Sequence, residues 1–237
     1  MAKFTSAMAT GAVIALLSTA AQALPFTNGS FEASPAPAGY NLLTGPLNGG
    51  ASTAIPGWMT VLNGVEWADP DNGGIPDFGD AVDGAMIVDL ANYIYTGGGL
   101  EQTFDTTPGT TYRVEFSGGS FLGHGRDGTA QIDVAAPGYS NTFSVDNPGA
   151  TLVWTQFFFD FVATGTSSTL RFSNSENPYT HFAMIDAVSV NAVPLPAAGW
   201  LLLSGLGALG IAGRRKLRAA HRPPAADQVY VCGTVGP

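Results

Sequence analysis

Short segments in which apolar and polar residues alternate fill the middle of the chain. In residues 111–116 every second residue is apolar, namely Tyr112, Val114 and Phe116, and residues 157–163 repeat the pattern with phenylalanines. A period of two residues is that of a strand with one buried face. The same reasoning predicts strands at residues 64–68, 86–90, 100–104, 130–135, 141–145, 169–173 and 182–190.

Turn signals separate these segments, and no amphipathic helical pattern of useful length lies between them. Examples are Pro108-Gly109, Pro137-Gly138 and Asn147-Pro148-Gly149. Two segments rich in glycine, residues 33–54 and 69–83, are predicted to be long loops. Many short strands without intervening helices predict a single all-β domain, an antiparallel β-sandwich over residues 24–192.

The N-terminal residues have the features of a targeting segment. Residues 1–23 hold a lone cation at Lys3, an apolar run at 11–17 and the small residues Ala21-Gln22-Ala23. This order predicts a secretory signal peptide cleaved after Ala23. The alternative is a buried N-terminal helix, but an apolar run this short, followed by small residues, suits cleavage better.

The C-terminal part carries a second apolar segment. Val193-Pro194-Leu195-Pro196 precedes the uncharged stretch 197–212, and the basic cluster 214–218 follows. Sixteen helical residues span roughly 24 Å, somewhat less than a hydrocarbon core of about 30 Å. The pattern predicts a membrane helix with its basic end in the cytoplasm, and a core helix is the alternative. Residues 219–237 show no periodicity and are predicted to be a disordered tail.

Charge in the central domain is strongly one-sided. Arg113, Arg126 and Arg171 are its only cations, and seventeen of the chain's eighteen carboxylates lie in residues 24–192, which gives a formal charge of −14. Such a surface repels anions, so nucleic acid is excluded as a partner. The one cysteine, Cys232, lies beyond the basic cluster, so no disulfide holds the domain together.

The order of a short proline motif, an apolar helix and an arginine cluster resembles the PEP-CTERM sorting signal of Gram-negative bacteria that make exopolysaccharide. The sorting motif here is Val193, Pro194, Leu195 and Pro196, with Leu195 where the commonest form has glutamate. The resemblance implies processing by a signal peptidase and an exosortase-type enzyme. It also implies a transient tether in the inner membrane, followed by delivery to the cell surface or the extracellular matrix of a biofilm.

A second resemblance rests on an ordered set of motifs in residues 26–191. The motifs are Phe26-Thr27-Asn28-Gly29-Ser30-Phe31-Glu32, Ile55-Pro56-Gly57-Trp58, Val65-Glu66-Trp67, Leu100–Phe104, Pro108–Tyr112 and Met184–Val190. In this order and spacing they are similar to the galactose-binding-like jelly-roll domains of the choice-of-anchor C family. The resemblance implies a jelly-roll sandwich that binds carbohydrate, with Trp58 in its core.

The same resemblance implies a structural calcium ion. Related modules place one where the first and last strands lie close together, and here Glu32 and Asp186 are the carboxylates in that position. Calcium takes six to eight oxygen ligands and tolerates irregular geometry. The alternative is that both carboxylates accept hydrogen bonds from backbone N–H groups. The acidic segment 69–83 lacks the spacing of a calcium-binding loop and is predicted to be solvated.

Aromatic faces beside polar side chains are a common means of holding a sugar ring. Trp67 has Glu66 beside it, and Tyr93 and Tyr95 have Asn92 beside them. These five residues are the predicted ligand-binding residues.

Catalytic motifs are missing from the sequence. It contains no Gly-x-Ser-x-Gly elbow, no His-Glu-x-x-His helix and no phosphate loop, and His124 and His181 each stand alone. We therefore predict a non-catalytic exported protein that binds exopolysaccharide or cell-envelope carbohydrate. The alternatives are a structural or adhesive surface protein without a small ligand, and a glycan-acting hydrolase.

Overall fold

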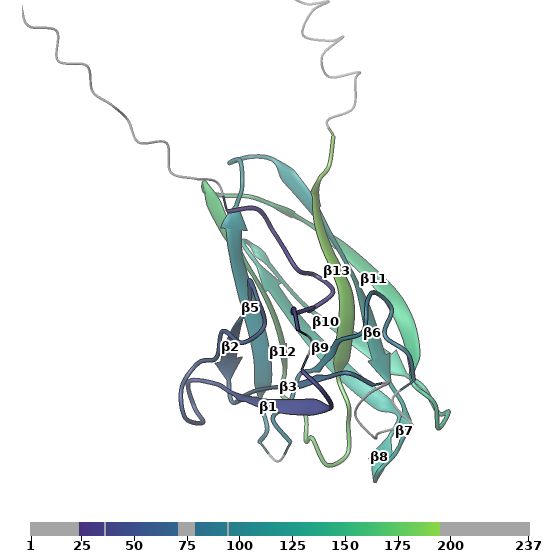
Figure 1. The fold of residues 1–237 in the computed structure, drawn as a ribbon. Helices are drawn as coiled ribbons and strands as arrows, with labels where there is room; N and C mark the ends of the chain where they lie inside the picture. Colours follow the sequence, from purple (N-terminus) through teal and green to yellow (C-terminus); the bar gives the residue numbers. More distant parts are fainter. Residues whose placement is uncertain (1–23, 36, 71–78, 94, 195–237) are drawn as a thin grey trace, which may run out of the picture. The chain divides into compact units, whose positions relative to one another are not determined.

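The computed structural model describes residues 24–35, 37–70, 79–93 and 95–194, which form an all-β fold (Figure 1). Within these residues the chain forms thirteen strands and no helix. Contacts along the whole chain divide it between Val193 and Pro194, and the fold belongs to the first part.

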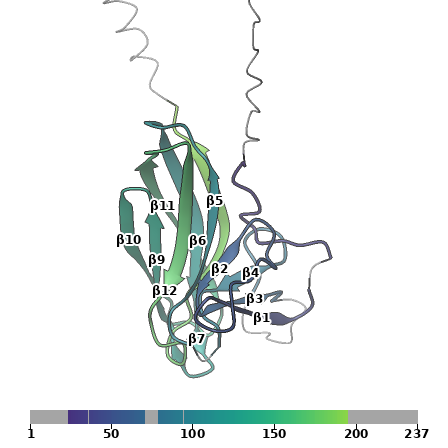
Figure 2. The same ribbon diagram turned by 90° about the vertical axis from the view of Figure 1, so that its left-hand side faces the viewer.

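Two antiparallel sheets make up the sandwich (Figures 1 and 2). The first has the order β1 (Tyr40–Thr44), β3 (Gly64–Ala68), β4 (Ile87–Asp89), β13 (Met184–Ala192), β6 (Thr111–Ser120) and β11 (Val153–Val162). The second has the order β10 (Tyr139–Asp146), β9 (Thr129–Ala136), β12 (Ser167–Asn174), β5 (Gly98–Asp105) and β2 (Met59–Leu62). A small hairpin pairs β7 (Leu122–Gly123) with β8 (Arg126–Asp127). The chain passes repeatedly between the two sheets, which confirms the predicted jelly-roll sandwich.

The alternating segments of the sequence become strands with the predicted faces. On β6, Val114 and Phe116 are buried, and on β11, Phe159 and Phe161 are buried. Between the sheets the rings of Phe116 and Phe172 lie 5.1 Å apart. Burying each such side chain contributes roughly 1.5–3 kcal/mol, so this row of aromatic residues is a main source of the domain's stability.

Four strands lie where the sequence predicted none, namely β1, β2, β7 and β8. Strand β1 falls inside the segment 33–54, which was predicted to be a loop, and β2 follows Trp58. Strand β1 is an edge strand that pairs only with β3, and its Tyr40 and Leu42 are exposed. Its burial pattern therefore gives a weak sequence signal. Trp58 lies in the core, as predicted.

The first described residues close one side of the sandwich by bonding to both sheets. Gln102 of β5 accepts a hydrogen bond from the Thr27 N–H and donates one to the Thr27 carbonyl, at 2.8 and 2.9 Å. The Gly29 carbonyl accepts the N–H of Val188 in β13 at 2.8 Å. The segment thus spans the gap between β5 and β13, which belong to different sheets.

Asn28 fixes the turn within this segment. Its backbone has a φ of 54°, and its side chain bonds to both the N–H and the carbonyl of Glu32 and donates to the carbonyl of Pro56. The turn directs Phe31 into the core, where its ring lies 5.2 Å from that of Trp58. Asparagine tolerates a left-handed backbone and bonds locally, which suits it to this position.

Strand β13 contains a β-bulge where the N-terminal segment meets it. Its register against β6 shifts between Asp186 and Ser189, and Ala187 has a φ of 51°. A bulge takes residues out of the ladder, so the N–H of Val188 can bond to Gly29 instead of to β6.

The two ends of the sandwich differ in what they hold. Leu24 and Val193 lie at one end, where their backbones bond to the end of β5 and the start of β6 (Figure 1). At the other end lie β1, residues 90–93 and 95–97, the hairpin residues 121–128, and residues 175–183 (Figures 1 and 2). We call this second group the distal end.

The targeting segments predicted from the sequence lie outside the described residues. This applies to residues 1–23 with their cleavage site after Ala23, and to Leu195, Pro196, the membrane helix at 197–212 and the tail at 219–237. In the part of the chain that the structure describes, no helix is long and apolar enough to cross a membrane.

The close contact at Gly29 predicts that a single methyl group added at this position strongly destabilises the fold. A Cβ atom at this position would lie 1.6 Å from the carbonyl oxygen of Val188, so Gly29→Ala must displace β13 or the N-terminal segment. We expect a loss of roughly 3 kcal/mol, seen as a fall of several degrees in the melting temperature. The matched control is Gly165→Ala, whose Cβ would lie an ordinary 3.5 Å from the nearest atom. Equal melting temperatures for the two variants would contradict the role given to Gly29.

Candidate functional site

A row of cross-strand neighbours crosses the outer face of the first sheet near the distal end. The row consists of Leu42, Glu66, Asp89, Met184, Gly119 and Trp154, one from each of β1, β3, β4, β13, β6 and β11. Glu66 and Asp89 are therefore direct partners on adjacent antiparallel strands. In such pairs the Cβ atoms lie about 5 Å apart, so the two carboxyl groups are neighbours.

Both carboxyl groups are buried although they point away from the main core. Glu66 is 7% exposed and Asp89 is 6% exposed. A second hydrophobic cluster occupies this outer face, formed by Ala68, Ile87, Phe121, Leu152, Phe182 and Met184. The connections of the distal end thus cover the outer face of the sheet and exclude water from the two acids.

Arg126 of β8 supplies the positive charge of this site. Its Nε donates to the carbonyl of Pro178 and its Nη1 to the carbonyl of His124, both at 2.9 Å. Its guanidinium lies over the ring of Phe182, 4.1 Å from the centroid. The arginine therefore joins the β7–β8 hairpin to residues 175–183.

Burial raises the pKa of both acids. It raises the pKa of Glu66 from 4.5 to about 7, opposed by the charge of Arg126 and by a hydrogen bond from the backbone of Tyr93. Burial also raises the pKa of Asp89 well above 3.8, and the neighbouring charge of Glu66 adds to the rise. Arg126 and the backbone of Ala183 act in the opposite direction on Asp89. Near neutral pH the pair therefore retains a proton that exposed carboxylates would have lost.

One oxygen of this pair has no hydrogen-bond partner. It is Oδ1 of Asp89, and in the same part of the sheet Nδ2 of Asn41 on β1 is also unpaired. A buried polar atom without a partner costs about 1–3 kcal/mol, so such atoms are uncommon in folded proteins. The oxygen is itself buried, so this unmet hydrogen bond lies inside the fold and not on a surface that a ligand contacts.

Four of the five predicted ligand-binding residues come together at the distal end. Glu66 receives a hydrogen bond from the backbone of Tyr93, and Asn92 is buried and donates to the carbonyl of Leu43 at 2.9 Å. Tyr93 is 55% exposed and Tyr95 is 41% exposed. Asn92 thus holds the connection against β1, while the two tyrosine rings face solvent.

Trp67 does not belong to this group, and its prediction as a sugar platform is wrong. Residues of β3 alternate, so Trp67 faces the core while Glu66 faces outward. Trp67 is 4% exposed, and its Nε1 donates to the carbonyl of Phe31 at 2.9 Å. Its ring offers no face to a ligand.

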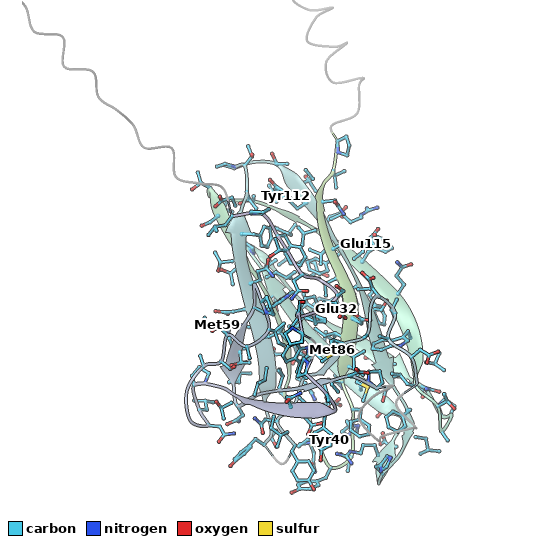
Figure 3. The ribbon with its side chains drawn as sticks, in the orientation of Figure 1. Glu32, Tyr40, Met59, Met86, Tyr112 and Glu115 are labelled. Carbon is cyan, nitrogen blue, oxygen red and sulfur yellow. The ribbon has the colours of Figure 1, made fainter. Side chains whose placement is uncertain are left out.

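Glu32 and Asp186 hold the segment 82–86, which leads directly into β4. Oδ2 of Asp186 accepts two backbone N–H groups at 2.7 and 3.0 Å, and Oε1 of Glu32 accepts two at 2.8 Å. The donors are Val82 and Asp83 for Asp186, and Ala85 and Met86 for Glu32. Figure 3 shows Glu32 and Met86 close together. Burial raises the pKa of Asp186 to about 6 despite these donors.

These contacts match the alternative to calcium binding, in which both carboxylates accept hydrogen bonds from backbone N–H groups. Among the described residues no group of three or more His, Cys, Asp or Glu side chains gathers in a way that could hold a metal ion. Backbone donors occupy one oxygen of Glu32 and both oxygens of Asp186, so the pair fits N–H groups better than a cation. Structural calcium stays a prediction, which the calcium dependence of the melting temperature decides.

Two residues of the site were missed from the sequence. Asp89 ends a short apolar strand, and nothing in its neighbourhood distinguishes it from an ordinary strand-end acid. Arg126 lies in the Gly-rich hairpin beside His124. Its being one of only three cations in an acidic domain is the signal that singles it out.

The raised pKa of Glu66 fixes the direction in which the stability of the fold changes with pH. The folded pKa, about 7, lies above 4.5, so the folded state binds more protons than the unfolded state in this range. The stability this proton gives is fully present below about pH 4.5 and is lost as the pH rises through 7. We expect the free energy of unfolding, measured with urea, to fall by roughly 3 kcal/mol between pH 5 and pH 8.

The substitution Glu66→Gln tests this assignment. The amide carries no charge, so the variant should show a flatter dependence and exceed the wild type in stability at pH 8. The control is Glu115→Gln, a like change on the outer face of β6, which should keep the wild-type slope. Parallel slopes for Glu66→Gln and the wild type would count against Glu66 as the titrating group.

Comparison with solved structures finds carbohydrate-binding modules. One described as "CBM4 structure and function" aligns with a TM-score of 0.41 and 16% identity over 70% of this chain and 99% of the other. TmCBM61 in complex with β-1,4-galactotriose aligns with a TM-score of 0.41 and 16% identity over 58% of this chain and 90% of the other. A family 35 carbohydrate-binding module from Clostridium thermocellum aligns with a TM-score of 0.35 and 15% identity over 47% of this chain and 81% of the other. These TM-scores are below 0.5, so the likenesses carry no argument about the ligand.

Comparison of the sequence with family models gives two matches, while no curated protein matches it significantly. Residues 192–216 match the PEP-CTERM protein-sorting motif, which confirms the predicted resemblance and indicates an exported protein sorted through a membrane anchor. Residues 24–191 match the model described as "Protein of unknown function (DUF642)". Because this second match covers the whole sandwich and more than half of the chain, the protein belongs to the DUF642 family.

Proposed function

We propose that this protein is a non-catalytic carbohydrate-binding protein of the cell surface or extracellular matrix, and that it holds its glycan at the distal end. Its ligand is exopolysaccharide or cell-envelope carbohydrate of the bacterium that exports it. The signal peptidase and an exosortase-type enzyme are its processing partners, and the inner membrane is a transient one.

The observation that carries this proposal is the position of two exposed tyrosines beside a buried acid pair. Tyr93 and Tyr95 present ring faces, and the backbone of Tyr93 bonds to Glu66. Sugar sites combine aromatic surface with a few fixed polar groups that orient the hydroxyls. Glu66 and Asp89 are fixed by their strands, and Arg126 is fixed by the carbonyls it bonds to. This combination supports glycan binding rather than a purely structural role.

The same acid pair supports the non-catalytic reading over the hydrolase. Glycoside hydrolysis needs two carboxyl groups that flank the scissile bond and that the substrate reaches directly. Glu66 and Asp89 are neighbours beneath the connections of the distal end. Both groups are also over nine-tenths buried, so they do not flank an open cleft in which a scissile bond could lie.

Removal of the two tyrosine rings should weaken glycan binding. We expect the variant with Tyr93→Ala and Tyr95→Ala to bind its best oligosaccharide at least tenfold more weakly than the wild type in calorimetric titration, because two stacking surfaces are lost. The control is Phe158→Ala, which removes an exposed ring from β11 and should leave the affinity unchanged. No binding to any oligosaccharide in a broad panel would favour the structural or adhesive alternative, and equal affinities would place the glycan elsewhere.

The proposed destination predicts a shortened chain. Processing at the sorting motif removes the apolar and basic segments, so protein recovered from its own host should end near Val193-Pro194-Leu195-Pro196. Intact mass spectrometry of the extracellular and membrane fractions measures this end. A mature chain that still extends to Pro237 in the extracellular fraction would contradict exosortase-type processing.

A further inference from the structure

Strand β11 has a free edge in the part of the chain that the structure describes. It is the last strand of its sheet, and β6 is the only described strand that pairs with it (Figure 1). The edge strand β10 packs on the inner face of β11, where the rings of Tyr139 and Phe159 stack 4.2 Å apart, but does not pair with it. Strand β11 has ten residues, whereas the other edge strands, β1, β2 and β10, have five, four and eight. A long free edge presents N–H and carbonyl groups to which another strand can bond.

The register of β11 against β6 shows which backbone groups face this edge. Ala163, just after β11, donates its N–H to the carbonyl of Thr110 at 3.0 Å, and the ladder that begins beside it with Val162 opposite Thr111 has no bulge. Bonded and non-bonded pairs alternate in an antiparallel ladder, so the odd-numbered residues of β11 bond to β6. The even-numbered residues therefore direct their N–H and carbonyl groups toward the free edge. Three of them, all exposed, lie at the middle of the strand, namely Gln156, Phe158 and Asp160.

This edge lacks the features that commonly keep an edge strand from pairing. Such features are lysine, proline, a bulge or an uncompensated charge. Strand β11 has no lysine and no proline, and its one charged residue, Asp160, bonds to Arg113 at 2.8 and 3.0 Å. The ring of Phe158 is 61% exposed, and the guanidinium of Arg113 lies 4.8 Å from its centroid. The edge therefore carries no net charge, although the domain is strongly acidic.

The side chains along this edge complement those of a second copy of the strand. If two β11 strands pair antiparallel about a two-fold axis at Phe158, the two Phe158 rings face each other and Gln156 of each copy faces Asp160 of the other. The amide of Gln156 donates hydrogen bonds, and the carboxylate of Asp160 accepts them. Val162 falls opposite Trp154, so apolar groups meet as well. An axis at Asp160 would instead set two carboxylates against each other.

We propose that β11 pairs with β11 of a second copy, so that the protein forms a two-fold dimer in which the two six-stranded sheets become continuous. The backbones of Gln156, Phe158 and Asp160 then form six hydrogen bonds between the copies, two for each bonded pair. An interface of this symmetry uses the same surface on both copies, so the assembly closes at two. Because the paired strands are antiparallel, the distal ends of the two copies point in opposite directions.

Disulfide trapping tests the register. Residues opposite each other in a bonded antiparallel pair have Cα atoms about 5.5 Å apart, a distance that a disulfide spans. Cys232 is the chain's only cysteine, so Cys232→Ser gives a full-length background without thiols. In that background, Phe158→Cys should form at least fivefold more disulfide-linked dimer under mild oxidation than either control. Non-reducing electrophoresis measures the dimer.

The two controls are exposed apolar residues on edge strands. Val162→Cys lies on β11 itself, but its two copies would be eight residues apart along the pair, roughly 26 Å. Leu42→Cys lies on β1, the opposite edge of the same sheet. Disulfide formation by Phe158→Cys at the level of these controls would overturn the proposed register.

A charge on the two-fold axis tests the pairing without a covalent bond. Light scattering of the protein recovered from its own host should give the mass of two chains for the wild type and of one chain for Phe158→Lys, because two like charges then face each other. Phe158→Glu should also be a single chain, and a mixture of the two variants should recover the mass of two chains. The control is Leu42→Lys on β1, which should keep the wild-type mass. Thermal melts establish that each variant is folded.

Three outcomes would show that β11 is not the interface. They are a wild type with the mass of one chain, equal loss of the dimer in Leu42→Lys and Phe158→Lys, and a mixture of the Phe158 variants that stays at the mass of one chain. None of these measurements uses a glycan. Failure of the dimer therefore leaves the proposed carbohydrate binding standing, and failure of carbohydrate binding leaves the dimer standing.

Discussion

The hydrogen bond from the Val188 N–H to the Gly29 carbonyl is the constraint on which the rest of the domain depends. It requires a bulge in β13 and a residue without a side chain at position 29, since a Cβ there would overlap the Val188 carbonyl. The bond ties the N-terminal segment to the first sheet, while Gln102 ties it to the second. Phe31 is thereby inserted into the core between the sheets. The segment acts as the closing side of the sandwich.

The same constraint extends to the candidate site. The bulge in β13 begins at Asp186, and the turn that follows Gly29 ends at Glu32, so these two carboxylates hold the segment 82–86 at both of its ends. That segment continues into β4, whose last residue is Asp89. Two buried acids side by side are costly, and a fold tolerates them where surrounding contacts over-determine their position. The hydrogen bonds from backbone N–H groups to Glu32 and Asp186 help to fix the position of Asp89, because they hold the segment that leads into β4.

Much of the fold was predictable from the sequence, because each strand with one buried face carries its own period of two. The site was only partly predictable. Glu66, Tyr93 and Tyr95 were identified by residue type, but Trp67 was assigned to the ligand although an alternating strand must turn it away from Glu66. Asp89 was missed because its pairing with Glu66 depends on the register of β3 against β4, and residues 69–86 connect these two strands. A local sequence pattern indicates which side chains of a strand are buried. The cross-strand partner of a residue depends instead on the path of the connection between the two strands.

The jelly-roll topology also separates the candidate site from Val193, where the chain leaves the sandwich. Strands β5, β6 and β13 run the length of the sandwich, and Val193 leaves it where β6 begins. Strands β1 and β3, and residues 90–93 beside them, lie toward the opposite end (Figure 1). Changes in those segments therefore leave the end of the sandwich that holds Val193 untouched. Conversely, cleavage beyond Val193 removes no residue that contacts Glu66, Asp89 or Arg126 among those described. The proposed binding and the proposed processing therefore draw on different parts of the chain, and a domain released at the sorting motif would keep the candidate site.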